Sequence, residues 1–396
     1  MARIEATRDR PGARDANALL ALPDRTVLVH DYLNQFGGAE RVLEVMHDLA
    51  PLAPVYTSIY DPAAMPASYQ DWDIRPSWID RLPGARAGHQ RYLPAYPLAF
   101  ERLKLPDCRL VLSSSSAFAK MVAPPPGAVH VCYTHSPMRF AWTLDQYIAR
   151  ERLPRAAGLA LRPYMAFLRR QDRATLPRVH QFIANSSVVR DRIGTWWGRD
   201  AVVIHPPVDV ERFTPVGADE IGEYFLMVSR LVPYKRFDLV IEACNALKLP
   251  LWIVGDGRDR PALEHIAGPT VRFLGRVGDD ELRDLYAHAR AALFMSEDDF
   301  GIAQVEAQAA GRPVIALKAG GAHDTVIDGV TGVHVRDQTV ESLIAAFGTF
   351  ERTSYAPDRL VEHARQFSRQ RFERELLEVV GATLERHAAG EAAAWS

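Results

Sequence analysis

The sequence predicts two α/β domains, each built around a parallel sheet with helices on both faces. Short apolar runs alternate with helical patterns along most of the 396 residues, and this alternation is typical of βαβ units. Near the middle, the stretch His205–Pro215 contains three prolines, and proline interrupts both helices and strand ladders. The length also suits two domains of about 190 residues each.

The elements of the first half follow from its apolar runs. The run Thr26–His30 predicts a buried strand, and a glycine pair and the helical pattern Ala39–Ala50 come after it. Further buried strands are predicted at Leu110–Leu112, Val129–Tyr133, Gln181–Ala184 and Ala201–Ile204. The polar run Ser113–Ser116 is predicted to cap a helix.

The second half repeats this pattern more regularly. Its predicted strands are Tyr224–Val228, Leu251–Gly255, Val271–Leu274, Ala292–Met295 and Val314–Ala316. Its predicted helices are Arg236–Leu247, Asp259–Ile266, Asp279–Ala289, Ile302–Ala310 and the long terminal pattern Ser368–His387.

These elements divide the chain into a tail at residues 1–24, a first domain at 25–205, a second domain at 216–366 and a terminal segment at 367–396. Doubly wound parallel sheets bind ligands beyond the carboxyl ends of their strands. The cleft between the two domains is therefore the expected site.

Composition limits the cellular setting. The tail contains four arginines but no apolar core, so it does not resemble a secretory signal. No stretch reaches the roughly 18 apolar residues of a membrane span. The three cysteines are far apart, which excludes a disulfide framework and a zinc spacing and predicts free buried thiols. We expect a cytoplasmic protein, either soluble or peripheral at the inner face of the cell membrane.

The charge is balanced overall but unevenly distributed. The formal net charge is −2, which disfavours a nucleic-acid partner. Residues 1–205 contain 26 basic and 19 acidic residues, whereas residues 206–396 contain 21 and 30. The basic half is expected to face an anionic partner, although chance variation between two solvated surfaces explains the same numbers.

Two polar motifs of the first domain follow predicted strands. Gly37 and Gly38 precede a helix, where backbone N–H groups can approach an anion, although a plain tight turn also accounts for two glycines. His135 follows the strand Val129–Tyr133 and is expected to face the cleft. A lone histidine in a loop is more often structural than catalytic. No histidines or carboxylates are spaced for a metal.

Two further motifs lie in the second domain. Arg230 and Lys235 stand between its first strand and the following helix, a position that suits a diphosphate, although solvated cations are the simpler explanation. An acidic cluster at Glu297–Asp299 precedes the helix that carries Glu306. Acidic residues favour helix N-termini in general. Glu306, however, lies among apolar neighbours and requires a partner, for which two adjacent ribose hydroxyls are suitable.

The motifs of the second domain resemble glycosyltransferase family 4. They read SRLVPYKRFDLVIEA, WIVGDG, FLGRV and EDDFGIAQVEAQAAGRPVIALKAGGAHDTVIDGVTGV. In the first domain, HDYLNQFGGAERVLE and CYTHSPMRFAW resemble bacterial mannosyltransferases that build exopolysaccharide and O-antigen units. The resemblance spans about residues 25–385. It implies the GT-B fold, in which two Rossmann-like domains face a cleft and a C-terminal helix crosses back to the first domain.

The resemblance also implies roles for individual residues. Arg230 and Lys235 would hold the diphosphate of a nucleotide-sugar donor, and Glu306 would bind its ribose. The main chain of Phe300, Gly301 and Ile302 would meet the sugar and phosphates, and Gly37 and Gly38 would approach the diphosphate from the other domain. His135 and Asp298 would lie beside the donor sugar. Members of this kind retain the anomeric configuration and need no metal or other cofactor.

One position departs from the family pattern. The family has a glutamate eight residues before the residue that corresponds to Glu306, and this chain has Asp298 there. Aspartate is one methylene shorter, so the contact with the sugar is in question. The leading hypothesis is transfer of mannose from GDP-mannose. The alternatives are a UDP-sugar donor and a non-catalytic protein that binds sugar nucleotides.

The expected acceptor is a polysaccharide glycan or a glycan linked to a lipid diphosphate. Aromatic and basic residues of the first domain would suit contact with an anionic membrane. They are Arg91, Tyr92, Tyr96, Phe100, Arg102 and Lys104. An ordinary partly buried helix explains the same pattern.

Overall fold

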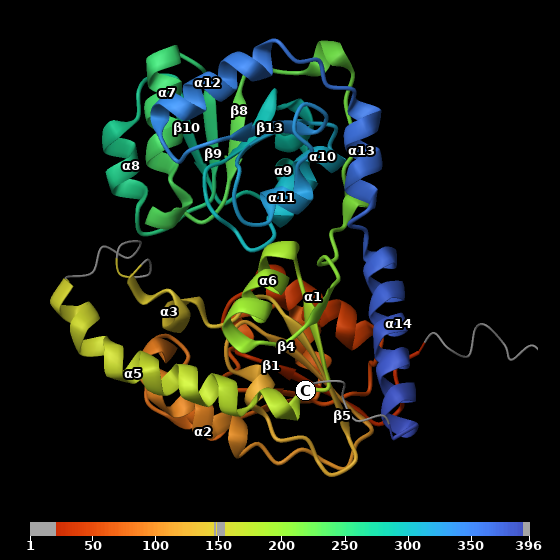
Figure 1. Cartoon of the computed structure of the whole chain (residues 1–396). Coiled ribbons are helices and arrows are strands. Elements are labelled where there is room, and N and C mark those ends of the chain that lie inside the picture. Colours follow the sequence, from red (N-terminus) through yellow and green to blue (C-terminus); the bar gives the residue numbers. More distant parts are fainter. Residues whose placement is uncertain (1–20, 146–147, 149–154, 391–396) are drawn as a thin grey trace, which may run out of the picture.

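The chain folds into two α/β domains stacked one above the other (Figure 1). The structure is a computed structural model that describes residues 21–145, 148 and 155–390. The first domain lies below in Figure 1, and the second domain lies above it.

The first domain contains a parallel sheet of seven strands in the order β3-β2-β1-β4-β5-β6-β7. The strands are β1 (Thr26–His30), β2 (Val55–Thr57), β3 (Ile74–Pro76), β4 (Leu110–Ser115), β5 (Val129–Thr134), β6 (Gln181–Ala184) and β7 (Ala201–Val203). The α-helices described in this domain are α1 (Gly38–Asp48), α2 (Tyr96–Glu101), α3 (Arg139–Trp142), α5 (Arg155–Ala174) and α6 (Ser187–Arg192).

The second domain contains a parallel sheet of six strands in the order β10-β9-β8-β11-β12-β13. The strands are β8 (Phe225–Val228), β9 (Leu251–Val254), β10 (Val271–Gly275), β11 (Ala291–Phe294), β12 (Val314–Leu317) and β13 (Gly332–Val335). Its helices are α7 (Phe237–Leu247), α8 (Arg260–Ile266), α9 (Asp279–His288), α10 (Ile302–Ala309), α11 (Ala322–Thr325), α12 (Val340–Glu351) and α13 (Pro357–Arg365).

Both sheets are buried on both faces, as parallel sheets require. In β1, Leu28 belongs to one apolar cluster, and Val27 and Val29 belong to the cluster on the opposite face. In β8, Phe225 and Leu226 divide between two clusters in the same way. The strand order reverses between β1 and β4 and between β8 and β11, and these switch points are where such sheets bind ligands.

The last helix, α14 (Arg369–Ala388), returns to the first domain and runs along it (Figure 1). Its buried residues Phe372, Leu376, Leu377 and Val380 join the cluster that contains β1 and α1. The chain therefore crosses between the domains twice, and the crossings pair with each other, because Val208 N–H donates to the carbonyl of Phe367 at 2.9 Å. This is the GT-B architecture, and the predicted fold class is confirmed.

The predicted elements agree closely with the structure, but three strands were not predicted. They are β2, β3 and β13. β2 and β3 have three residues each, and β3 is a half-exposed edge strand, so neither gives a continuous apolar run. β13 begins with Gly332, which weakens its strand signal. The expected helix cap at Ser113–Ser116 is wrong, because Ser113–Ser115 are buried residues of β4.

Candidate functional site

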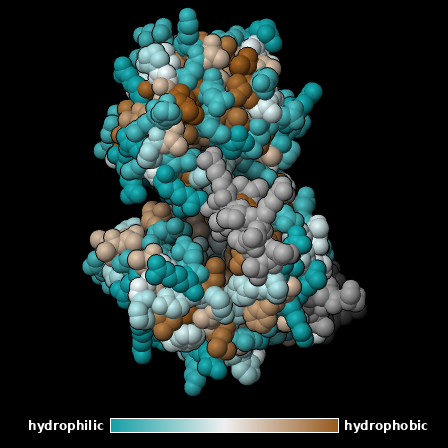
Figure 2. Space-filling model, turned by 90° about the vertical axis from the view of Figure 1, so that its left-hand side faces the viewer, coloured by the Kyte–Doolittle hydropathy of each residue, from teal (hydrophilic) through white to brown (hydrophobic). Residues whose placement is uncertain are grey.

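A cavity of about 310 Å³ lies between the two domains. Its walls come from loops after β1, β5, β8 and β11, at the carboxyl ends of the strands. Gly38 and His135 line it from the first domain, and Lys235, Asp298 and Gly301 line it from the second. Figure 2 shows the groove that separates the domains on this side of the molecule.

The N-termini of two helices meet across this cavity. α1 begins at Gly38 and α10 begins at Ile302. A Cβ atom on Gly38 would lie 2.8 Å from Cδ1 of Ile302, so the missing side chain permits the close approach. No hydrogen bond from the backbone N–H groups of Phe300, Gly301 or Ile302 occurs within the described residues. Helix N-termini carry a partial positive charge, and unpaired N–H groups there can donate hydrogen bonds to an anion.

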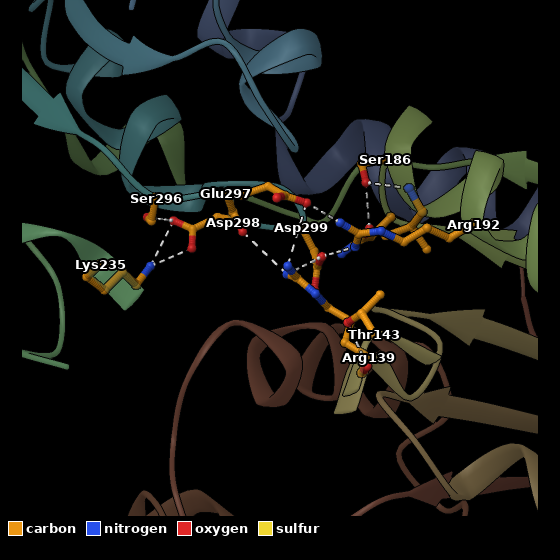
Figure 3. Close-up of polar contacts among 11 residues, drawn as sticks. Arg139, Thr143, Ser186, Arg192, Lys235, Ser296, Glu297, Asp298 and Asp299 are labelled. Atoms are coloured by element: carbon orange, nitrogen blue, oxygen red, sulfur yellow. Dashed lines mark hydrogen bonds and ion pairs between the residues drawn. The ribbon is translucent and has the colours of Figure 1, made fainter. Parts of the chain in front are cut away.

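Lys235 and Asp298 form an ion pair on the second-domain wall (Figure 3). Lys235 Nζ lies 2.7 and 2.8 Å from the two carboxylate oxygens. Ser296 Oγ donates to the same carboxylate at 3.0 Å. Burial alone raises the pKa of Asp298, but Lys235 and Ser296 outweigh it and hold the pKa below its ordinary value. The Asp298 carboxylate therefore reaches Lys235, although aspartate is one methylene shorter than the glutamate of the family pattern.

Glycines support the loop that carries Asp298. Gly321 N–H donates to the carbonyl of Asp298 at 2.8 Å. A Cβ atom on Gly320 would lie 2.1 Å from the same carbonyl oxygen, and Gly320 has a φ of +62°. Gly301, which directly precedes α10, has a φ of +97°. The glycines of this segment are thus required by close contact and by left-handed backbone.

Four charged residues next to Asp298 connect the domains (Figure 3). Arg139 and Arg192 belong to the first domain, and Glu297 and Asp299 belong to the second. Arg192 Nη2 lies 2.7 Å from Glu297 Oε1, and Arg139 Nη1 lies 3.0 Å from Asp299 Oδ1. Arg192 also contacts Asp299. We call these four residues the interdomain ion-pair cluster.

Glu306 lies on α10 and also contacts the first domain. Arg41 Nη1 on α1 donates to Glu306 Oε1 at 2.9 Å, and Tyr286 OH donates to Oε2 at 3.3 Å. The carboxylate is buried, so these two donors supply the partner that its apolar surroundings require.

His135 faces the cavity and is held by a serine. Its Nε2 atom lies 2.7 Å from Ser114 Oγ. Burial, and to a lesser extent the neighbouring His30, lower the pKa of His135 to about 3. The imidazole is therefore neutral near pH 7.

Three of the predicted residues, Gly37, Arg230 and Glu306, do not line the cavity. Arg230 is exposed, and its Nη1 atom lies 3.5 Å from Oε1 of Gln35 in the first domain. Phe300 does line the cavity, and its side chain packs against His205 and Phe367. Gly37 is the residue directly before α1.

Sequence reasoning missed several residues of the site. Arg41 lies three residues after Gly38, and Arg139 lies four residues after His135. Their neighbours were the only available signal. No sequence pattern marks Arg192 or Tyr286, because only the fold brings them to the cleft.

The described residues contain no candidate metal site and no candidate membrane-spanning helix. In residues 21–145, 148 and 155–390, no group of three or more histidines, cysteines and carboxylates could hold a metal ion. Over the same residues, no helix is long and apolar enough to cross a membrane. The three cysteines are free and buried.

Both halves of the chain match family models. Residues 36–212 match the model described as Glycosyltransferase Family 4, and residues 211–367 match Glycosyl transferases group 1. A D-inositol 3-phosphate glycosyltransferase of Gordonia bronchialis is 30% identical over 252 residues, 54% of each protein. A glycogen synthase of Pseudomonas paraeruginosa is 36% identical over 134 residues, 32% of this chain and 26% of the relative. The chain spans about half the length of the inositol phosphate relatives it matches.

Solved structures share the fold over nearly the whole chain. Anabaena Alr3699/HepE, solved with UDP and glucose, gives a TM-score of 0.67 at 18% identity, covering 90% of this chain and 100% of that one. Sucrose-phosphate synthase from Thermosynechococcus elongatus gives 0.66 at 18% identity, covering 93% and 100%. The chain thus has the GT-B fold, and each half matches a glycosyltransferase model.

Proposed function

We propose that this GT-B protein is a glycosyltransferase that takes a sugar from a nucleoside diphosphate donor in the interdomain cavity. The observation that carries the proposal is the convergence of two helix N-termini and Lys235 on one cavity. These groups offer positive charge and free N–H donors to a diphosphate. When the bond between the sugar and the diphosphate breaks, negative charge develops on the leaving group, and the same groups stabilise it.

The other candidate residues would each contact a different part of the donor. Asp298 and His135 line the cavity, where the sugar would fit. Glu306, which is not among the residues that line the cavity, would bind the ribose. For the ribose hydroxyls to reach Glu306, Arg41 must share or release that carboxylate. Arg230 would meet the diphosphate through a change of rotamer, since its side chain is exposed. The resemblance to family 4 supports retention of the anomeric configuration.

The donor we favour is GDP-mannose, because the first-domain motifs resemble bacterial mannosyltransferases. A UDP-sugar is the second candidate. It is supported by the solved neighbour Alr3699/HepE, whose complexes contain UDP and UDP-glucose. A non-catalytic protein is the third candidate, suggested by the aspartate at position 298.

A donor screen separates these candidates. The purified chain would be titrated calorimetrically with GDP-mannose, UDP-glucose and UDP-N-acetylglucosamine, and hydrolysis or transfer would be followed for each donor. We expect binding and slow turnover with GDP-mannose. Turnover with a UDP-sugar alone would show that the donor is a UDP-sugar and not GDP-mannose. Binding without turnover of any donor would support the non-catalytic alternative.

For the acceptor we propose a polysaccharide or lipid-diphosphate-linked glycan, reached at the inner membrane face through the first domain. Tyr96 and Phe100 cannot contribute to such a surface, because both are buried in the core. Exposed apolar residues are instead Trp78 and Leu98. Exposed basic residues nearby in sequence are Arg91, Arg102 and Lys104. Sedimentation with anionic and neutral vesicles at low salt tests this part, and equal binding to both would remove it.

A further inference from the structure

Four buried polar side chains form a continuous chain from α1 to the cavity. Glu40 Oε1 lies 3.4 Å from His30 Nε2. The other ring nitrogen of His30, Nδ1, lies 3.0 Å from Ser114 Oγ, and the same hydroxyl lies 2.7 Å from His135 Nε2. The exposed fractions of Glu40, His30, Ser114 and His135 are 3%, 2%, 0% and 9%. Only His135, at one end, lines the cavity.

The hydroxyl in the middle determines how protons are arranged along this chain. Ser114 has one proton to donate, so it can donate to only one of its two imidazole partners and must accept from the other. The Glu40 carboxylate attracts the proton of His30 to Nε2, which leaves Nδ1 of His30 as an acceptor. Ser114 then donates to His30 and accepts from Nε2–H of His135.

We propose that Glu40, His30 and Ser114 are positioning residues that fix the tautomer of His135, with its proton on Nε2 and the lone pair of Nδ1 available to the cavity. The inference rests on the proposed function, in which His135 contacts the donor sugar. In the described part of the chain, Nδ1 makes no hydrogen bond and is not a buried unpaired atom. His135 would therefore accept a hydrogen bond from a sugar hydroxyl.

A second serine–histidine pair shows what a purely structural arrangement looks like. Ser113, the neighbour of Ser114 on β4, has its Oγ atom 2.8 Å from His130 Nε2. The other nitrogen of His130 lies 3.2 Å from the main-chain carbonyl of Arg178. Both ring nitrogens of His130 thus have partners within the first domain. The chain that ends at His135 differs, because it runs from a carboxylate to the cavity.

The tautomer can be measured without any donor present. In protein labelled with ¹⁵N-histidine, long-range proton–nitrogen correlations distinguish a protonated ring nitrogen from an unprotonated one, and His135→Gln assigns the signal. We expect protonated Nε2 and unprotonated Nδ1 for His135. Ser114→Ala should give a mixture of tautomers at His135, and Ser113→Ala should leave His135 unchanged. A wild-type signal with the proton on Nδ1 would overturn the proposal.

Kinetics then test whether the tautomer matters. With the donor found in the screen, we expect Ser114→Ala to lower kcat about tenfold, the worth of one neutral hydrogen bond, with a change of about twofold or less in donor KM. Ser113→Ala should keep wild-type turnover. Glu40→Gln keeps the side-chain volume. It should shift the tautomer of His135 and lower kcat, as Ser114→Ala does.

Two outcomes would contradict different parts of the argument. An unchanged His135 signal in both Ser114→Ala and Glu40→Gln would show that the chain does not set the tautomer. Full turnover in His135→Gln would instead show that His135 has no role in the proposed function. In that case the wild-type nitrogen signals would still test whether the hydrogen-bond chain fixes the tautomer.

Discussion

Lys235 and Asp298 form a charged pair on the wall of the cavity. Their ion pair is largely buried, with side-chain exposures of 15% and 18%. The pair keeps both charges in place without leaving either one unpaired in a poorly hydrated wall. Under the proposed function, a diphosphate would compete with Asp298 for Lys235, and this competition would limit the affinity for the donor.

At this scale we predict that Lys235→Ala lowers transfer by roughly 100-fold or more while the protein stays folded. The substitution removes a cation that stabilises the leaving group. The rate with the preferred donor is the measurement, and circular dichroism checks the fold. Lys248→Asn, at an exposed left-handed position that asparagine tolerates, is the control. Wild-type transfer in Lys235→Ala would contradict the assignment.

Buried histidines give a second prediction, concerning stability and pH. The pKa values of His130 and His135 are lowered by burial to about 3, from an ordinary value of 6.5. Between these values the unfolded state binds more protons than the folded state, so stability falls as pH falls from 6.5 toward 3. Each histidine contributes a slope of at most about 1.4 kcal/mol per pH unit.

Urea unfolding at several pH values measures this slope. His130→Gln should make the slope shallower, and His265→Gln, at an exposed position on α8, should leave it unchanged. An identical slope for wild type and His130→Gln would contradict the burial effect.

At the scale of elements, the loop between β11 and α10 is the part of the site that depends most on backbone geometry. It carries Asp298 and ends at Gly301, and it lies against the segment before α11. The sequence contained part of the signal, because Gly301 lies two residues after Asp299 and the pair Gly320 and Gly321 comes later in the chain. It did not show that the two segments touch, since a contact between distant loops depends on the strand order.

We predict that Gly320→Ala lowers both stability and transfer. An alanine there has an unfavourable positive φ, which costs about 1 kcal/mol, and its Cβ would clash with the carbonyl of Asp298. Gly329→Ala is the matched control, because Gly329 has a φ of +74° and no neighbour within 4 Å of a built Cβ. Both variants should lose similar stability from φ, and only Gly320→Ala should lose activity. Equal activity in the two variants would show that the contact is dispensable.

At the scale of the whole molecule, the domains are held together by polar contacts beside the cavity. The interdomain ion-pair cluster lies on one side of it, and Arg41 and Glu306 form another contact between the domains. The two crossings of the chain near Val208 and Phe367 form the covalent connection. We interpret the crossings as the hinge and the ion pairs as contacts that favour closure.

We therefore predict that Arg192→Ala shifts the protein toward an open arrangement. It removes partly buried ion pairs, which changes the ratio of closed to open forms about tenfold. The radius of gyration from X-ray scattering should increase, and the KM for the donor should rise. Arg190→Ala is the control, because Arg190 is exposed and pairs with Asp191 within the first domain. An unchanged scattering profile and KM in Arg192→Ala would rule out this role.

Local sequence patterns were enough to predict the two α/β domains, most strand positions and the segments that line the cleft. They were enough because burial of strands and amphipathic helices leaves a local period in the sequence. Lys235, Asp298, Gly38 and His135 each follow a predicted strand, and the resemblance to glycosyltransferase family 4 singled them out as candidates.

How these segments meet depends on the tertiary fold. It places Arg41 on Glu306 and Arg139 and Arg192 on the acidic loop, links Glu40 to His135, and buries Tyr96 and Phe100. The physical reason is that such contacts join residues tens to hundreds of positions apart, and their geometry depends on strand order and domain closure rather than on any local pattern.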